Sequence, residues 1–87
     1  MPWRGNKMGC AYRDGEGVPK DQKEAVQWFR LAARQGNDEA QHNLGEACLK
    51  GEGVRKNRAQ AEKWLRKAAE QGHKKAHKQL KSLAAGK

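Results

Sequence analysis

One stretch occurs twice in this chain, first as Ala25-Val26-Gln27-Trp28-Phe29-Arg30-Leu31-Ala32-Ala33-Arg34-Gln35-Gly36 and again as Ala61-Glu62-Lys63-Trp64-Leu65-Arg66-Lys67-Ala68-Ala69-Glu70-Gln71-Gly72. The two copies lie 36 residues apart. In each copy an Ala precedes the Trp by three residues, an Ala pair follows it, and a Gly ends the stretch. That spacing is typical of a helix with one apolar face and a C-terminal glycine. A repeat at this fixed offset predicts an all-α solenoid of antiparallel helix hairpins.

A short glycine-rich segment precedes each copy, as Gly15-Glu16-Gly17-Val18 and as Gly51-Glu52-Gly53-Val54. Glycine adopts the left-handed conformation that ends a helix and turns the chain, so each segment is predicted to separate the two helices of a hairpin. The valine that follows is expected to pin the loop to the core. Neither segment has the Gly-Lys-Ser/Thr ending of a phosphate-binding loop, so phosphate binding is not expected there.

Two polar pairs mark where the second helix of each hairpin begins. Asp21 with Glu24, and Asn57 with Gln60, have the spacing of a capping box. The predicted helices are 3–14, 21–35, one from about 37, 58–71, and a last one that Gly86 ends. The single domain therefore divides into repeat 1 at about 4–36, repeat 2 at about 37–72, and a capping half-repeat at about 73–86.

The helix faces predicted to be buried consist mainly of alanine, with tryptophan and a few larger apolar residues, and Gly45 gives room for a neighbouring helix. They are Ala25, Trp28, Phe29, Ala32 and Ala33, then Ala40, Leu44, Ala47 and Cys48, then Ala61, Trp64, Leu65, Ala68 and Ala69, and finally Ala76, Leu80 and Leu83.

Both end helices are expected to be weak. Gly5 and Gly9 each cost up to about 1 kcal/mol relative to Ala in a helix interior, so the first helix should be short or frayed. Lys74 and Lys75 stand where the preceding repeat has acidic residues. Positive charge at a helix start opposes the macrodipole, so the last helix should be the weakest part of the C-terminal half.

The composition sets limits on the fold and on partners. The 87 residues suffice for one domain, and the 36% hydrophobic and 6% aromatic content predicts a thin core. The formal charge of +9 is unevenly placed, because residues 1–43 carry +1 and residues 44–87 carry +8. This asymmetry favours a partner with acidic character.

The chain shows no run long enough to span a membrane and no apolar signal core, so we expect it to be cytoplasmic as given, while export of a longer precursor stays open. Cys10 and Cys48 do not occupy equivalent positions in the repeat, and we predict free thiols in a reducing compartment. Cys48 stands where the first copy has Tyr12 and is expected to pack as a small hydrophobe. No cofactor is expected.

The repeated residues resemble the Sel-one-like repeat, a tetratricopeptide-related α/α repeat of about 36 residues. The resemblance covers residues 8–80, with departures at Arg4, Met8, Cys48 and Asn57. The residues that match are Gly9, Tyr12, Gly15, Gly17, Val18, Ala25, Trp28, Ala32, Ala33 and Gly36 in the first copy, Ala40, Leu44, Gly45, Gly51, Gly53, Val54, Ala61, Trp64, Ala68, Ala69 and Gly72 in the second, and Ala76 and Leu80 in the third.

The resemblance implies an adaptor or scaffold protein of a family with many bacterial members, and it carries over no catalytic residue. In related arrays the first helix of each pair lines a concave groove. By the repeat alignment the groove positions here are Asn6, Cys10, Arg13, His42, Glu46, Leu49, Lys50, Lys78 and Ser82. Such a mixed but mainly basic face suits an extended or helical peptide with acidic character.

Three other kinds of site have some support in the sequence. His73 and His77 lie four residues apart, as in a two-point metal site, but no third ligand lies nearby in the sequence. Cys10 with His42 resembles a nucleophile and its base, but no orienting group is evident. The basic run 73–87 could contact phosphates, yet no aromatic residue follows Trp64 to stack a base.

The sequence therefore predicts a non-enzymatic protein–protein interaction module of two full repeats and a capping helix. The alternative is an electrostatic binder of nucleic acid or another polyanion through the basic C-terminal half. A metal protein or a small enzyme is a third, less supported class. Solenoids usually need about three repeats to stand alone, so self-association through the open ends or a longer parent protein is also expected.

Overall fold

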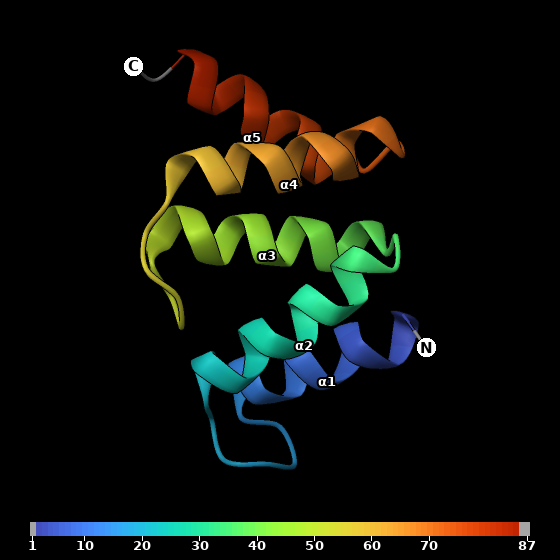
Figure 1. The fold of residues 1–87 in the computed structure, drawn as a ribbon, viewed down its shortest axis with the longest axis vertical. Coiled ribbons are helices and arrows are strands. Elements are labelled where there is room, and N and C mark those ends of the chain that lie inside the picture. Colours follow the sequence, from blue (N-terminus) through green and yellow to red (C-terminus); the bar gives the residue numbers. More distant parts are fainter. Residues whose placement is uncertain (1, 86–87) are drawn as a thin grey trace.

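The chain folds into five helices that pack in sequence, as a computed structural model of residues 2–85 shows (Figure 1), with side chains described from Gly5 onward. The array measures 37 × 23 × 17 Å. The predicted all-α solenoid of helix hairpins is confirmed, whereas the predicted stop at Gly86 lies outside the described residues. The helices are α1 (Pro2–Asp14), α2 (Gln22–Arg34), α3 (Asp38–Lys50), α4 (Arg58–Glu70) and α5 (Lys74–Ala85).

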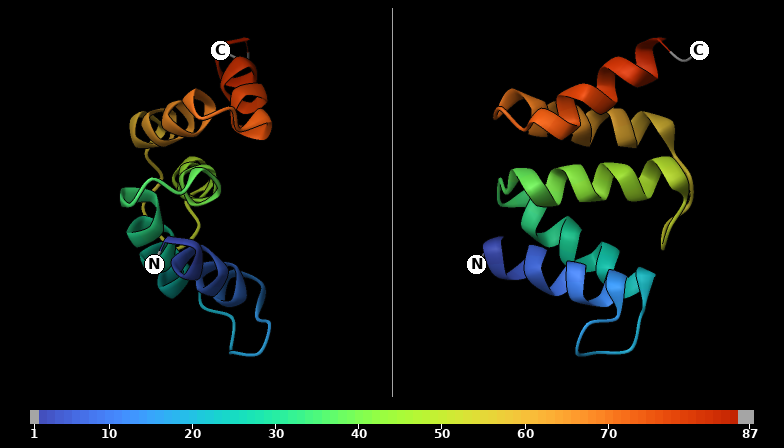
Figure 2. Two further views of the ribbon diagram at one scale, coloured as in Figure 1. Left: turned by 90° about the vertical axis from the view of Figure 1, so that its right-hand side faces the viewer. Right: turned by 180° about the vertical axis from the view of Figure 1, so that it is seen from behind.

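The first and second helices of the hairpins lie on opposite sides of the array. Figure 2 shows α1, α3 and α5 on one side and α2 and α4 on the other. The row formed by α1, α3 and α5 is curved, and its concave face points away from α2 and α4. The connection 51–57 runs from the end of α3 back along the array toward α2 (Figure 1). Across residues 2–85 no helix combines the length and the apolar character needed to cross a lipid bilayer.

The first helix is not short, so that part of the expectation is wrong. It has 13 residues, as many as each of the next three helices. Its glycines provide packing, because a Cβ added at Gly9 would lie 2.5 Å from the ring of Phe29. In the second hairpin a Cβ at Gly45 would lie 2.8 Å from Leu65 Cγ. The close approach gained at each glycine offsets its intrinsic helix cost.

The core is built from alanine faces around a few larger side chains. The largest fully buried side chains are Phe29, Leu44 and Leu65. Val26 is also buried, although its position was not predicted to be. Trp28 and Trp64 were predicted to be buried but are half-buried, since alanine-faced helices pack too closely to enclose an indole ring on every side. The tryptophans therefore lie at the margin of the core.

The caps of α2 and α4 tie each second helix to the end of the first. The side chain of Asp21 accepts a hydrogen bond from the backbone N–H of Glu24 at 3.2 Å, and Asn57 accepts one from Gln60 at 3.0 Å. The N–H of each cap residue donates to the carbonyl of Tyr12 or Cys48, at 2.9 and 2.8 Å. Half of each predicted capping box is thus present. The other half is replaced by a bond between the helices of the hairpin.

Candidate partner-binding groove

The side of the array formed by α1, α3 and α5 carries a pocket of about 800 Å³. Its walls come from helices that are far apart in the sequence, because the repeat places the first helix of every hairpin on this side (Figure 2). The lining residues are Cys10, Arg13, Glu39, His42, Asn43, Glu46, His73, Lys74, Lys75, Lys78, Gln79 and Ser82.

Most of the positions predicted for the groove lie together in this pocket. Asn6 does not line it, but its side chain bonds to Glu39 and Asn43, which do. Leu49 was placed in the groove by the repeat alignment, but it packs against the hydrophobic core. Lys50 is exposed outside the pocket. The six predicted residues that line the pocket are Cys10, Arg13, His42, Glu46, Lys78 and Ser82.

Asn43 holds the floor of the groove together, although it was not predicted as a groove residue. Its Nδ2 donates to Asn6 Oδ1 at 2.9 Å, and its Oδ1 accepts from Arg13 Nη1 at 3.4 Å. Asn6 Nδ2 in turn donates to Glu39 Oε1 at 3.3 Å. The network fixes α1 against α3. Asn43 could have been found from the sequence, because it lies three residues before Glu46 and therefore on the same helix face.

His42 is a structural residue of the groove wall and not a free contact. It is only 9% exposed, and its Nε2 lies 3.1 Å from Oε1 of Gln79 on α5. Its ring stacks on that of His73, with centroids 4.8 Å apart and an interplanar angle of 22°. These contacts connect α3 to the start of α5. The position faces the groove, but Gln79 of α5 and His73 cover most of the His42 ring.

His73 and His77, which were considered as a two-point metal site from their spacing, have different surroundings. His73 precedes the first turn of α5 and acts as its cap, since its Nδ1 accepts a hydrogen bond from the N–H of Ala76 at 3.2 Å. His77 lies on α5 and is exposed. Among residues 2–85, no three His, Cys, Asp or Glu side chains are grouped so that they could hold a metal ion. His73 therefore has the same role at the start of α5 that Asn37 has at the start of α3.

The thiol of Cys10 is not paired with a base. The polar neighbour of its Sγ is Asn43 Nδ2 at 3.8 Å, whereas His42 is directed to Gln79. Burial raises the pKa of the Cys10 thiol above its ordinary value, and this outweighs the lowering by Arg13. The thiol therefore stays protonated near neutral pH, which is the opposite of what an activated nucleophile requires.

Charge in the groove is divided between its two walls. Glu39 and Glu46 lie on α3, and the lysines Lys74, Lys75 and Lys78 lie on α5. All three lysines are exposed. The groove is therefore basic along α5 and acidic along α3, and Arg13 of α1 adds a cation that is paired with Asp14.

The helix order, the glycine loops and the groove on the side of the first helices define an α/α repeat protein. A model of the Sel1 repeat matches residues 6–37 and 38–73. The chain belongs to the Sel1 repeat family, as the resemblance predicted. Sel1 repeats generally mediate protein interactions and are typically non-catalytic. A search among curated proteins finds no match.

Solved structures of three bacterial proteins are similar to this chain. A Sel1 repeat protein from Oxalobacter formigenes has 47% sequence identity and a TM-score of 0.89 over 91% of this chain and 32% of its own. A protective antigen of uropathogenic Escherichia coli has 42% identity and a TM-score of 0.90 over 92% and 17%. Cysteine rich protein B of Helicobacter pylori has 31% identity and a TM-score of 0.82 over 86% and 56%. The chain thus spans only part of each of these proteins.

Proposed function

We propose that the chain is a non-enzymatic interaction module that binds an extended segment of a partner protein in the groove of α1, α3 and α5. The observation that carries the proposal is the pocket of about 800 Å³ lined by side chains of all three helices. A segment lying across these helices would contact both repeats and the capping helix at once. The specificity for the partner would then come from side chains of several helices together.

The charges of the groove indicate the chemistry of this partner. Carboxylates of the segment would lie along α5, near Lys75 and Lys78, and a donor group would face Glu46 on α3. The polar network around Asn43 keeps α1 and α3 in one arrangement. A preformed surface loses little conformational entropy on binding, which favours a peptide-binding role over a site that forms only around its ligand.

The test uses Cys10, because its side chain lines the groove whereas Cys48 is buried. Affinity purification with the unlabelled chain would first recover a partner from an extract of the native host. A photo-crosslinker attached at Cys10 should then capture the same partner from that extract. Charge reversal at Lys78, by Lys78→Glu, should then weaken binding of the purified partner by about fivefold, as expected for a rim charge pair worth about 1 kcal/mol.

A matched control is Arg66→Glu, which makes the same charge change at an exposed position of α4, outside the groove. The proposal requires binding to survive Arg66→Glu and to weaken with Lys78→Glu. Equal loss of binding in both variants, or no loss in either, would show that the partner does not bind in the groove.

The alternative function is electrostatic binding of nucleic acid or another polyanion through the C-terminal half. It is supported by α5, on which Lys74, Lys75, Lys78 and Lys81 are all exposed. No acidic residue follows Glu70 in the sequence. Contacts of this kind are lost steeply with added salt, whereas a peptide seated in the groove keeps its shape-dependent contacts. Titration of oligonucleotide and partner peptide at two salt concentrations separates the two functions.

We also propose a reducing compartment, the cytoplasm, and end-to-end association of the array. Both cysteines are free thiols, which favours a reducing environment. The side of α1 that faces away from α2, and the outer side of α5, would receive further repeats in a longer array. Measurement of mass against concentration tests the association, and a monomer at all concentrations would contradict it.

A further inference from the structure

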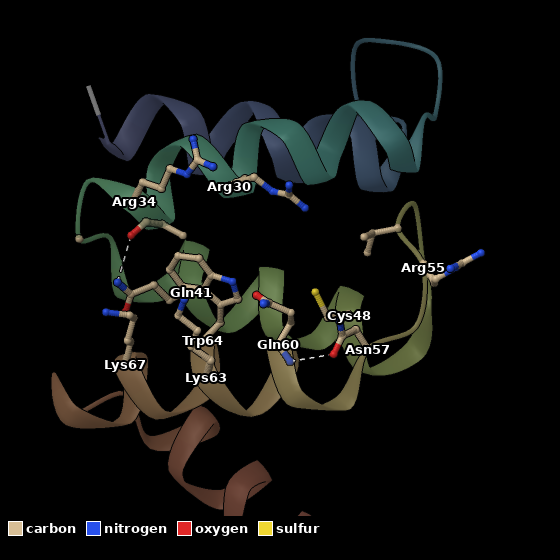
Figure 3. A pocket seen from close by; sticks show the side chains of 13 residues that line it. Arg30, Arg34, Gln41, Cys48, Arg55, Asn57, Gln60, Lys63, Trp64 and Lys67 are labelled. Atoms are coloured by element: carbon tan, nitrogen blue, oxygen red, sulfur yellow. Dashed lines mark hydrogen bonds between the residues drawn. The ribbon is translucent and has the colours of Figure 1, made fainter.

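A second pocket, of about 790 Å³, lies on the opposite side of the array, between α2 and α4, with α3 as its floor (Figure 3). The residues that give it its character are Arg30 and Arg34 from α2, Arg55 from the connection 51–57, and Lys63, Trp64 and Lys67 from α4. A smaller hollow of about 440 Å³ continues it along α2. The two hollows share Arg30, Arg34 and Val54, and together they are called the basic channel below.

The basic channel collects positive charge that has no counter-charge. Its lining contains six Lys or Arg side chains and no carboxylate. Among the described residues, the ion pairs are Arg13 with Asp14, Lys50 with Glu46, and Arg58 with Glu62, and none of them involves the channel. Cations held together in a concave surface repel one another, and an anionic ligand would relieve that repulsion. The six are Lys23, Arg30, Arg34, Arg55, Lys63 and Lys67.

Apolar groups lie among these cations. Leu31 lines the smaller hollow and is 48% exposed. Among the described residues it is the one large hydrophobic side chain that is exposed. Val54 and Trp64 are half-buried against the core and line the first hollow. In Figure 3 the indole ring of Trp64 lies between α2 and α4, with Arg30 and Arg34 on the opposite wall. A ligand that fills the channel would therefore meet both cations and apolar surface.

We propose that the basic channel binds an acidic peptide segment that carries an aromatic or aliphatic anchor residue. The guanidinium groups of Arg30 and Arg34 can form paired hydrogen bonds with carboxylates. The anchor would pack on Trp64 and Val54, and a second apolar residue would cover Leu31. Both needs of the channel, negative charge and apolar cover, are met by one chain of Asp and Glu interrupted by apolar residues.

An acidic peptide fits the channel better than a nucleic acid strand does. Proteins that hold single strands usually offer several aromatic rings in succession, and Trp64 is the one aromatic residue in the lining of either hollow. The exposed Leu31 also has no use in a phosphate track.

The proposal is independent of the groove described above. The basic channel faces the side of α2 and α4, and no residue lines both the channel and the groove. A bound segment in one surface would leave the other open. Failure of either proposal therefore does not decide the other.

The experiment uses a fluorescent peptide of Asp and Glu with a central Phe, titrated by anisotropy at physiological salt. The double variant Arg34→Glu with Lys67→Glu should weaken binding by about tenfold or more, because two cations of the channel become repulsive. The matched control is Lys7→Glu with Arg66→Glu, which changes the charge by the same amount at positions of α1 and α4 that line neither the channel nor the groove. All four side chains are exposed, so both variants should keep the helical circular dichroism of the parent chain.

Two further probes define the outcome. A peptide of equal charge without the Phe should bind several-fold more weakly, since it lacks the apolar anchor. The indole N–H resonance of Trp64 should shift on binding while that of Trp28 stays in place. Equal weakening in the two double variants, or a single-stranded oligonucleotide of equal charge that binds more tightly than the peptide, would overturn the proposal.

Discussion

The two repeats carry the same glycine loop, but only the loop of the second repeat packs closely against a neighbouring helix. Gly17 and Gly53 have nearly identical backbone conformations, with φ of 80° and 77°. A Cβ added at Gly17 would meet nothing within 4 Å, whereas one at Gly53 would overlap the backbone carbonyl of Gln22 at the start of α2. The same motif therefore ends a helix in the first repeat, and in the second it also joins two repeats.

This difference follows from position along the array and not from the local sequence. The connection 51–57 lies against α2, the helix of the preceding repeat, whereas the connection 15–21 lies at the open end (Figure 1). Val54 accordingly packs against the first core cluster. The second repeat thus uses its loop residues in an interface with the first, while the first repeat of this chain makes no such contact at Gly17.

The largest effect is expected from the matched core residues Phe29 and Leu65. Replacing either by Ala should lower the free energy of unfolding by about 3 kcal/mol, since both are fully buried. Phe29→Ala should loosen α1, whose Gly9 packs on that ring, and Leu65→Ala should loosen α5, whose Ala76 shares its cluster. Hydrogen exchange by residue measures which helix opens.

The control for this pair is Leu31→Ala, at an exposed position of α2. It should change stability by no more than about 0.5 kcal/mol. If both core variants open all five helices together, the two repeats form one cooperative unit and not a sum of separate ones.

The glycine loops test the comparison directly. Gly17→Ala and Gly53→Ala should share a backbone cost of about 1–2 kcal/mol, because both residues have positive φ. Gly53→Ala should cost about 1–3 kcal/mol more, because the loop must move away from α2. Urea midpoints of the two variants give the difference. Equal midpoints would show that the contact at Gln22 yields without cost.

A smaller effect is expected at the helix caps. Asp21→Ala and Asn57→Ala should each cost about 1 kcal/mol, since each removes one side-chain acceptor from the first turn of a helix. The two costs should be equal, because the cap geometry is the same in both repeats. Asn57→Asp, which keeps the acceptor, serves as the control in thermal unfolding. A clear difference between the repeats would mean that the interface, and not the cap, holds the start of α4.

The smallest effect concerns the thiols and pH. Burial raises the pKa of both Cys10 and Cys48 above the ordinary value. On raising the pH through that ordinary value, the unfolded chain loses the thiol protons first, so stability should fall from there upward. Replacing Cys48 by Ala should flatten this decline. Thiol labelling at neutral pH should modify the half-buried Cys10 before the buried Cys48, and the reverse order would contradict the arrangement.

Much of the fold could be predicted because the repeat is local. Each hairpin carries its own stop at Gly15 or Gly51 and its own start at Asp21 or Asn57, so the helices follow from nearby residues. The first helix was misjudged because Gly9 was treated as an isolated helix residue. Its value comes from Phe29, which lies 20 residues away and presses on it.

The groove was predicted less completely than the helices, although the repeat alignment placed Arg13, Glu46 and Lys78 on its walls. It gave no sign that His42 would stack on His73 or that Asn43 would bridge α1 and α3. Those contacts depend on how far one helix is rotated and shifted against the next. No residue pattern within a single helix encodes that register.

The sequence by itself determined that this protein is a helical repeat, because the spacing of alanine, tryptophan and glycine acts within each hairpin. Only the tertiary structure decided which surfaces the repeat creates. The groove on α1, α3 and α5 and the basic channel between α2 and α4 each gather residues from separate helices. Stacking one hairpin on the next brings those residues together, and side-chain packing at the glycines sets how closely they meet.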